Sequence, residues 1–294
     1  MATTKQATET RTRLDVLKSY KLFIGGAFPR SESGRVTEVR DGQGRFVANV
    51  AKASRKDARD AVRAARKAQP GWAGATAYNR GQVLYRVAEV LEGRSAQFVD
   101  ELRRTEGLSA DRARRQVEDA IDLWVWHAGW TDKIAQIGGS ANPVAGPYFN
   151  FSVPEPTGVV AIVAPQSQGL LGLTSVVAPA LVTGNAVVVV PAAGSPLVAI
   201  SLAEVLATSD LPGGVVNVLT GEPAELAPWL AAHADVNALD LTGAGELEWI
   251  DFEIAAADTL KRVIRPEPGI APETPQRILA LTETKTVWHT KSRM

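Results

Sequence analysis

Two kinds of hydrophobic pattern divide the sequence. Between residues 54 and 134, apolar residues recur every three to four positions, as they do in amphipathic helices. From residue 158 to 243, continuous Val/Ile-rich runs of strand length alternate with segments of helix length. Such runs indicate parallel strands that are buried on both faces. With right-handed crossovers, they predict an α/β fold built on a doubly wound parallel sheet.

The first half is expected to be mainly helical. A short hairpin-like segment (21–36), with Gly25-Gly26 as its turn, precedes the helices. Ser54, with Asp57 three residues later, forms a variant of the capping box, and Pro70 is expected to end that helix. The further helices are predicted to cover 78–93, a segment capped by Ser95, and a segment from Ser109 to about Ile134. The buried face of the last helix is expected to comprise Val117, Ala120, Ile121, Trp124 and Ala128.

The second half supplies the predicted sheet and the place for a site. The expected strands are 158–164, 185–191, 214–219 and 236–243, and the expected helices are 170–182, 196–208, 223–233 and 246–261. Ligands of open α/β sheets bind beyond the carboxyl ends of the strands. The candidate loops are therefore Pro165–Gly169, Pro191–Ser195, Thr220–Glu222 and Thr242–Gly245.

Three segments lie outside this pattern. Residues 137–157 are rich in Gly and Pro and are expected to form a turn and one arm of a hairpin at a sheet edge. The segment 262–276 has four prolines and is expected not to continue the core sheet. Residues 278–288 are Thr-rich and predict a single exposed strand, which needs a sheet in this chain or in a partner. One face of that strand would carry Thr282, Thr284, Thr286 and Trp288.

Charge and hydropathy exclude several classes of function. Lys plus Arg and Asp plus Glu number 32 each, so no general attraction to nucleic acid or to membranes is expected. The basic stretch 52–67 is interpreted as a solvated helix face. No apolar run reaches the length of a membrane span, and the N-terminus has no apolar signal core. Residues 1–19 are expected to be a flexible tail, and the protein is expected to be cytoplasmic.

The sequence contains no cysteine, which excludes thiol nucleophiles, thiolate metal sites and disulfides. The three histidines are far apart along the chain, so no metal site is predicted. Trp124, Trp126 and Trp130 are interpreted as packing residues.

Several stretches together resemble the aldehyde dehydrogenase superfamily: LFIGGAF, EPTGVVAIVAP, APALVTGNAVVVVPA, SPLVAISLAEVLATSDLPGGVVNVLTG, AAHADVNALDLTG and TETKTVWH. The resemblance implies a Rossmann-like dinucleotide-binding-type domain with N-terminal helices at 20–136 and 158–265. It also implies oligomerisation strands at 137–157 and 277–290. The family's catalytic domain would lie between residues 265 and 277, so the resemblance implies a shortened member that lacks this domain.

The resemblance also implies a lost reaction. The family oxidises aldehydes with NAD(P) after attack by a cysteine thiolate, and this sequence has none. Ser167 stands where the family keeps an asparagine that donates to the oxyanion. Pro266 stands where the family keeps its general base, and Glu267 lies one residue away. Ser167 and Glu267 are thus vestigial catalytic positions.

The implied cofactor site is eroded as well. By the resemblance, Val190 and Ala193 replace a lysine and a glutamate that hold the adenosine ribose, and Ala244 replaces a serine that contacts phosphate. The remaining candidates for cofactor binding are Pro165, Ser167, Thr220, Gly221, Thr242 and Gly243. NAD(P) binding is expected to be weak or absent, and the glycines are interpreted mainly as turn residues.

Three hypotheses follow. The first is a catalytically inactive subunit that assembles, through its hairpin and terminal strand, with a full-length aldehyde dehydrogenase or with itself. The alternative is an NAD(P)-binding protein of the aldehyde oxidoreductase family with residual or partner-dependent activity. A decaying pseudogene product is the third, although the coherent helix and turn patterns argue against it.

Overall fold

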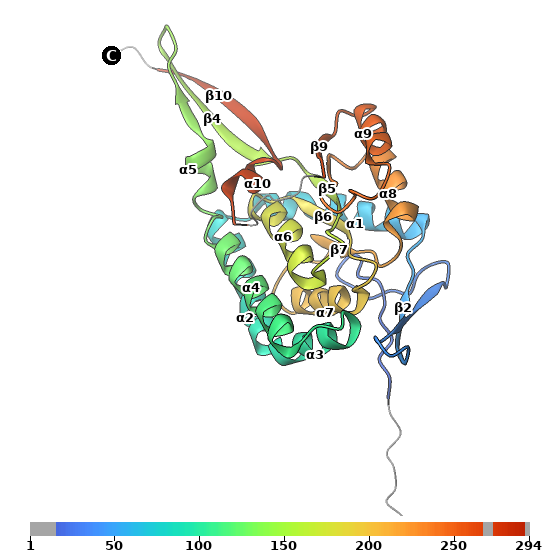
Figure 1. Cartoon of the computed structure of the whole chain (residues 1–294). Coiled ribbons are helices and arrows are strands. Elements are labelled where there is room, and N and C mark those ends of the chain that lie inside the picture. Colours follow the sequence, from blue (N-terminus) through green and yellow to red (C-terminus); the bar gives the residue numbers. More distant parts are fainter. Residues whose placement is uncertain (1–15, 267–272, 292–294) are drawn as a thin grey trace, which may run out of the picture.

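A five-stranded parallel sheet forms the centre of the protein (Figure 1). The computed structural model describes residues 16–266 and 273–291. The strand order is β7-β6-β5-β8-β9, and it reverses between β5 and β8, as the prediction of a doubly wound sheet requires. The strands are β5 (Val159–Val163), β6 (Ala186–Val190), β7 (Val216–Val218), β8 (Ala238–Asp240) and β9 (Arg262–Ile264).

The strand β9 shows that one prediction was wrong, because the segment 262–276 does contribute to the sheet. Arg262, Val263 and Ile264 pair in parallel with β8. The first proline of the segment is Pro266, two residues beyond the end of the strand. The strand residues therefore keep the backbone N–H groups that pairing needs.

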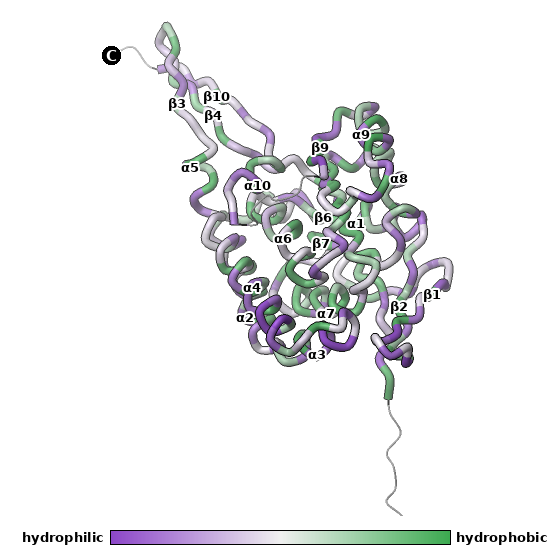
Figure 2. Tube along the Cα trace, viewed as in Figure 1, coloured by the Kyte–Doolittle hydropathy of each residue, from purple (hydrophilic) through white to green (hydrophobic). Residues whose placement is uncertain are grey.

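Helices cover both faces of the sheet. Alternate residues of β5 enter two separate cores: Val160 and Ile162 contact one, and Val159, Ala161 and Val163 contact the other. The helices on one face are α1 (Arg55–Gly74), α8 (Pro223–Ala232) and α9 (Trp249–Ala257). On the other face are α6 (Gly169–Val182) and α7 (Pro196–Ala207), backed by α2 (Ala77–Gly93), α3 (Ser95–Thr105) and α4 (Ala110–Ala128). Figure 2 shows the hydrophobic residues along α7 and the neighbouring strands.

The helix predictions need three corrections. Pro70 lies inside α1, which continues to Gly74 because Trp72 is buried and its Nε1 donates to the Leu181 carbonyl at 3.1 Å. Ser95 is the first residue of α3 and not its cap. The fourth helix ends at Ala128, and a short helix α5 (Ile134–Gly138) follows. The cap predicted at Ser54 is confirmed, as are the start of α4 after Ser109 and its buried face.

The N-terminal segment closes the β7 edge of the sheet. Ile24 and Ala27 exchange two backbone hydrogen bonds around the predicted Gly25-Gly26 turn. Phe23 exchanges two more with Val218 of β7. An antiparallel hairpin that the sequence did not predict follows, made of β1 (Val36–Arg40) and β2 (Phe46–Ala51).

A three-stranded antiparallel sheet, here called the arm, projects from the body (Figure 1). It comprises β3 (Ser140–Asn142), β4 (Tyr148–Pro156) and β10 (Thr282–Thr290), in the order β10-β4-β3. The prediction placed this segment at a sheet edge, but β4 is the central strand of the arm. The terminal strand finds its sheet within this chain, because β10 pairs with β4 along its full length.

The start of the terminal segment also differs from the prediction. Residues Pro275–Leu279 form a short helix, α10, which packs against α5 and α6. Ile278 and Leu281 are fully buried there and fix the base of the arm to the body. None of the described helices is long and apolar enough to cross a membrane.

Candidate functional site

The carboxyl ends of β5 and β8 meet at the switch point of the sheet, where open α/β sheets bind their ligands. Here the two loops touch. The Gly243 N–H donates to the Val163 carbonyl at 2.9 Å. A Cβ atom at Gly243 would lie 1.8 Å from the Ala164 carbonyl oxygen, so only glycine fits. Gly243 thus holds two loops of the chain together, which favours the interpretation of this glycine as structural.

Thr242, the neighbouring candidate, belongs to a buried polar network. Its Oγ1 donates to Asp240 Oδ1 at 2.5 Å and accepts from Arg277 Nη2 at 3.0 Å. Arg277 comes from α10, and its Nη2 lies 2.7 Å from Asp240 Oδ2. Its Nε donates to the Ser175 carbonyl at 3.0 Å. Because Asp240 and Arg277 are 0% and 4% exposed, the chain itself covers this end of β8.

Thr220 and Gly221 do not join the other candidates. They follow β7, which lies two strands away from β5. Thr220 is buried, and its Oγ1 donates to the Ala51 carbonyl at 2.6 Å. Its own carbonyl accepts from the Ala53 N–H at 2.7 Å. This turn therefore anchors the segment that leads into α1.

The N-terminus of α6 is hydrogen-bonded to the carboxylate of Glu106, a residue from elsewhere in the same chain. Glu106 Oε1 accepts from the Gly169 N–H at 3.1 Å and from Ser195 Oγ at 2.7 Å. Gln116 Oε1 accepts from the Leu170 N–H at 3.0 Å. The free N–H groups of a helix start attract anions. At α6 these groups are already satisfied by side chains from the region of α3 and α4.

The turn after β5 is tied to the turn after β6. Gln166 Nε2 donates to the Ala164 carbonyl at 2.7 Å, and Gln166 Oε1 accepts from the Ala193 N–H at 3.1 Å. Pro165 is half-buried, and Ser167 is exposed in the same turn. The structure thus brings Pro165 close to Gly243, and the Ser167 carbonyl lies near Gly172 at the start of α6. Glu267, the other vestigial position, lies outside the described residues.

Two of the three replaced anchor positions lie in apolar surroundings. Val190 and Ala244 are fully buried, and Ala193 is exposed at the β6 turn. Sequence reasoning missed Glu106, Gln116 and Arg277, which occupy the region where a ligand would bind. Asp240 had a signal, because a charged residue at the end of an apolar strand needs a buried partner.

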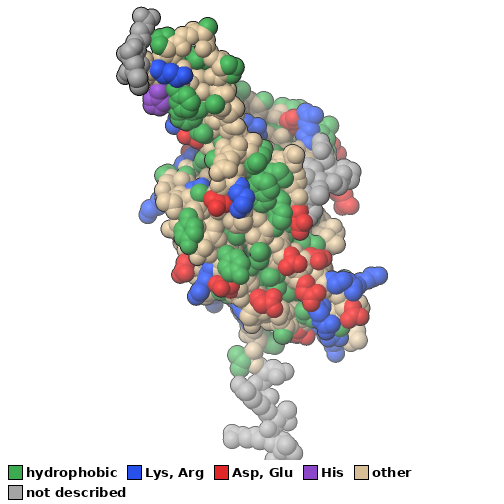
Figure 3. All heavy atoms as spheres, turned by 90° about the vertical axis from the view of Figure 1, so that its left-hand side faces the viewer, with side chains coloured by type: hydrophobic (Ala, Val, Ile, Leu, Met, Phe, Trp, Pro, Cys, Tyr) green, Lys and Arg blue, Asp and Glu red, His purple; other side chains and the backbone are tan. Residues whose placement is uncertain are grey.

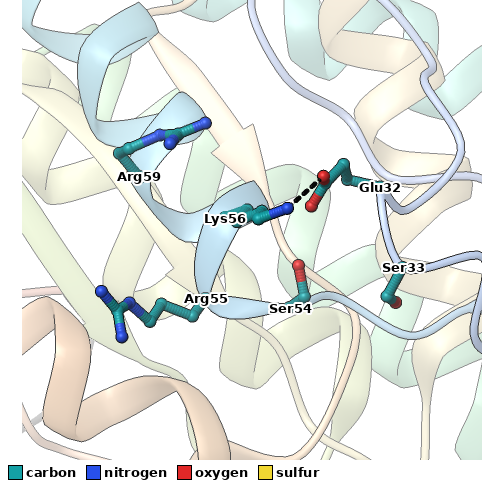
Figure 4. Close-up of a pocket in the computed structure, with 6 residues that line it drawn as sticks. All are labelled: Glu32, Ser33, Ser54, Arg55, Lys56 and Arg59. Atoms are coloured by element: carbon teal, nitrogen blue, oxygen red, sulfur yellow. Dashed lines mark hydrogen bonds and ion pairs between the residues drawn. The ribbon is translucent and has the colours of Figure 1, made fainter.

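A separate cavity of about 640 Å³ opens at the start of α1 (Figure 4). Its basic lining residues have partners. Lys56 Nζ lies 2.5 Å from Glu32 Oε1, the Arg55 guanidinium lies 4.1 Å from the Trp229 ring centre, and Arg59 pairs with Asp60. Figure 4 shows the Arg55 side chain directed away from the Lys56–Glu32 pair. The positive charges therefore do not converge on one ligand position.

No metal centre is assembled by the part of the chain that the structure describes, since it holds no group of three or more His, Asp or Glu side chains placed to bind an ion. His127 lies buried on α4, and its Nδ1 donates to the Leu123 carbonyl at 2.8 Å. Burial lowers the pKa of His127 to about 4.

Comparisons with known proteins agree with this architecture. The sequence profile of the aldehyde dehydrogenase family matches residues 28–266. Retinal dehydrogenase 2 of Gallus gallus is 33% identical over 265 residues, which cover 87% of this chain and 50% of that protein. The NAD+ complex structure of an aldehyde dehydrogenase from Bacillus cereus is similar with a TM-score of 0.77 at 27% identity, covering 84% of this chain and 50% of that one. HpcC from Thermus thermophilus is similar with a TM-score of 0.77 at 31% identity, covering 84% and 47%.

The chain spans about half the length of the curated relatives and solved structures that it matches. The matched region contains the parallel sheet, its helices and the switch-point loops. On the sequence match and the shared fold, the chain belongs to the aldehyde dehydrogenase family.

Proposed function

We propose that this chain is a non-catalytic subunit that assembles, through the arm, with a full-length aldehyde dehydrogenase. The observation that carries the proposal is a projecting arm with an open strand edge on a chain that has no cysteine. A second copy of this chain is the alternative partner. The role would be structural or regulatory, with the reaction performed by the partner.

The arm offers a template for strand addition. Among the described residues, β10 pairs on one side only, so the outer backbone groups of this nine-residue strand face no other strand. Such an edge readily pairs with another chain. The arm also exposes Tyr148, Phe149 and Trp288, and Trp288 is 60% exposed. Large exposed aromatic residues are typical of interfaces.

A second apolar surface lies on the body. Ile250 and Ile254 occupy one side of α9, four residues apart, and are 57% and 65% exposed. Leu260, after the same helix, is 92% exposed. Neighbouring exposed apolar residues mark a site of interaction. This surface gives a partner subunit a second point of contact.

The chemistry supports a complex in which the partner performs the reaction and this chain does not. Oxidation of an aldehyde through a thioester needs a thiolate nucleophile, which this sequence does not contain. Ser167 lies in an exposed turn. Within the described residues, its hydroxyl group has no hydrogen bond to a side chain that could act as a base. Any aldehyde oxidation in the complex would therefore use the partner's cysteine.

Removing β10 should abolish the hetero-complex. A chain ending at Leu281 loses the edge strand but keeps Ile278, Leu281 and the Arg277–Asp240 pair. A chain ending at Thr290 keeps β10 and serves as the matched control. Tagged versions of both would be purified from the host. The expected result is that the dehydrogenase copurifies with the control and not with the shorter chain, and equal recovery from both would refute the arm as the docking element.

NAD(P) binding by this chain is the second candidate function. It is favoured by the similarity to a structure described as an NAD+ complex. The contacts of Gly243, Thr242 and Glu106 within the chain argue for weak or absent binding. We expect isothermal titration with NAD+ or NADP+ to give no heat at about millimolar cofactor. A dissociation constant of about 1 mM corresponds to a binding free energy near −4 kcal/mol, and binding by this chain should be weaker than that. A dissociation constant near 1 μM, about −8 kcal/mol, would instead support a cofactor-binding role.

A further inference from the structure

A cavity of about 260 Å³ lies between the N-terminal segment and β2, on the side of the body away from α4 (Figure 1). Three cations line it, Lys21, Arg30 and Arg35, and its described lining contains no carboxylate. Ser19 and Asn49 add a hydroxyl group and an amide. Pockets for drug-sized ligands usually measure about 300–1,000 Å³, so a ligand of this cavity should be smaller.

Backbone hydrogen bonds hold the walls of this cavity in place. The Tyr20 segment is joined to β2 by two of them. The Leu22 N–H donates to the Pro29 carbonyl at 3.1 Å, so residues 21 and 30 are neighbours on adjacent segments. The Arg35 carbonyl accepts from the Lys52 N–H at 2.9 Å. Because these bonds exist before a ligand enters, binding would require little ordering of the backbone.

Lys21 and Arg30, here called the unpaired cations, are exposed. Within the described residues, neither side chain forms an ion pair or a hydrogen bond. The same part of the chain offers no side-chain hydrogen bond to the Asn49 amide or the Ser19 hydroxyl. The cavity is therefore lined by two positive charges and two polar groups whose hydrogen-bonding capacity is unused.

The carboxylates around the cavity are paired with other cations. Glu225 lies 3.2 Å from Arg35 and 2.8 Å from Lys52, so two cations share this one carboxylate. Glu38, on the neighbouring strand β1, lies 2.7 Å from Arg40. Neither carboxylate neutralises the unpaired cations.

Two further carboxylates lie toward α1. Glu32 pairs with Lys56 at 2.5 Å. Asp57 is buried in the first turn of α1, and its Oδ2 accepts from the Ser31 and Ser54 hydroxyls at 2.8 Å each. The positive end of the helix dipole also stabilises a negative charge at that position. The unpaired cations therefore leave the cavity with a surplus of positive charge.

We propose that this cavity binds the phosphate group of a small phosphate monoester. Such a group carries a charge of about −1.5 to −2 near neutral pH and three acceptor oxygens. The Arg30 guanidinium can donate to two of these oxygens at once, and Lys21 supplies a second positive charge. Val36, which also lines the cavity, would contact the carbon atoms of the ester. The cavity shares no residue with the arm or the switch-point loops, so this binding goes beyond the proposed function.

Isothermal titration of the full chain with phenyl phosphate, in about 0.05 M salt, tests the proposal. We expect a dissociation constant of about 1 mM or lower. Phenol, which has the same ring without the phosphate group, should give no heat at equal concentration. Lys21→Gln and Arg30→Gln should each raise the dissociation constant of phenyl phosphate about fivefold to tenfold. Raising the salt to about 0.5 M should weaken binding, because it screens exposed charges.

Arg112→Gln is the matched control, because it removes the same charge from an exposed arginine that has no ion pair among the described residues. Arg112 belongs to α4, on the side that faces the viewer in Figure 3, where acidic side chains are numerous over the lower body. This variant should change the dissociation constant less than about twofold. Circular dichroism of every variant checks that the fold is kept.

Three results would overturn the proposal. The first is no heat with phenyl phosphate up to about 10 mM, and the second is equal binding of phenol. The third is an equal loss of affinity in Arg112→Gln and Arg30→Gln, which would mean that only the net charge matters. The titration contains no dehydrogenase, so its outcome is independent of the hetero-complex.

Discussion

Replacing Arg277 with methionine should lower the free energy of unfolding by about 3–5 kcal/mol. The reason is that Asp240, which is 0% exposed, would keep a buried negative charge after its counter-ion at 2.7 Å is removed. The Ser175 carbonyl and Thr242 Oγ1 would also lose a donor. Since Arg277 connects α10 to the sheet, the loss should extend to the base of the arm.

Urea denaturation followed by fluorescence and circular dichroism measures this change. The double variant Asp240→Leu/Arg277→Met removes both charges and should recover most of the lost stability, because apolar replacement of a buried pair is often nearly neutral. Arg104→Met is the exposed control, since its pair with Asp100 is more than half exposed and should contribute less than about 1 kcal/mol. If Arg277→Met costs no more than Arg104→Met, the buried pair does not hold the junction.

Acid should destabilise the protein through His127. Burial is the main cause of its pKa of about 4, and the positive charge of Arg277 lowers the pKa further. In the unfolded chain the imidazole takes up a proton near pH 6.5, whereas in the folded chain it does so only near pH 4. Between these values the unfolded state binds more protons, so stability is lost as the pH falls, by about 3 kcal/mol in total.

The measurement is the free energy of unfolding as a function of pH, for the wild type and for His127→Leu. The variant should show a flatter dependence between pH 6.5 and 4 than the wild type. Burial raises the pKa of Glu101, which works in the opposite direction, and the comparison of the two chains cancels this contribution. Parallel curves for the two chains would mean that His127 does not control acid stability.

The local patterns of the sequence predicted the core well. Continuous apolar runs predicted β5 and β6 because both faces of these strands are buried, and polar caps predicted the starts of α1 and α4. Prediction failed where contacts between distant residues decide the structure. The turn of α1 after Pro70 is held by Trp72 against α6. The strand β9 is only three residues long, and the prolines that follow it made the whole segment look unsuited to a sheet.

The candidate site shows the same division. Topology alone placed the loops after β5 and β8 together, because the sheet order reverses there. The sequence did not show that Glu106 satisfies the start of α6, 63 residues away along the chain. Nor did it show that Arg277 reaches Asp240 across 37 residues. Glu106 and Arg277 fill the region beyond the ends of β5 and β8, where a ligand would otherwise bind. A single sequence carries no signal for contacts between residues so far apart.

Native mass spectrometry of the tagged protein, purified gently from its own host, tests the central proposal most directly. We expect a defined complex whose mass equals one or more copies of this chain plus whole copies of a full-length aldehyde dehydrogenase. The complex should release this chain when β10 is removed. A spectrum that contains this chain only, as monomer or homo-oligomer, at every protein concentration tested would contradict the assignment of a dehydrogenase partner.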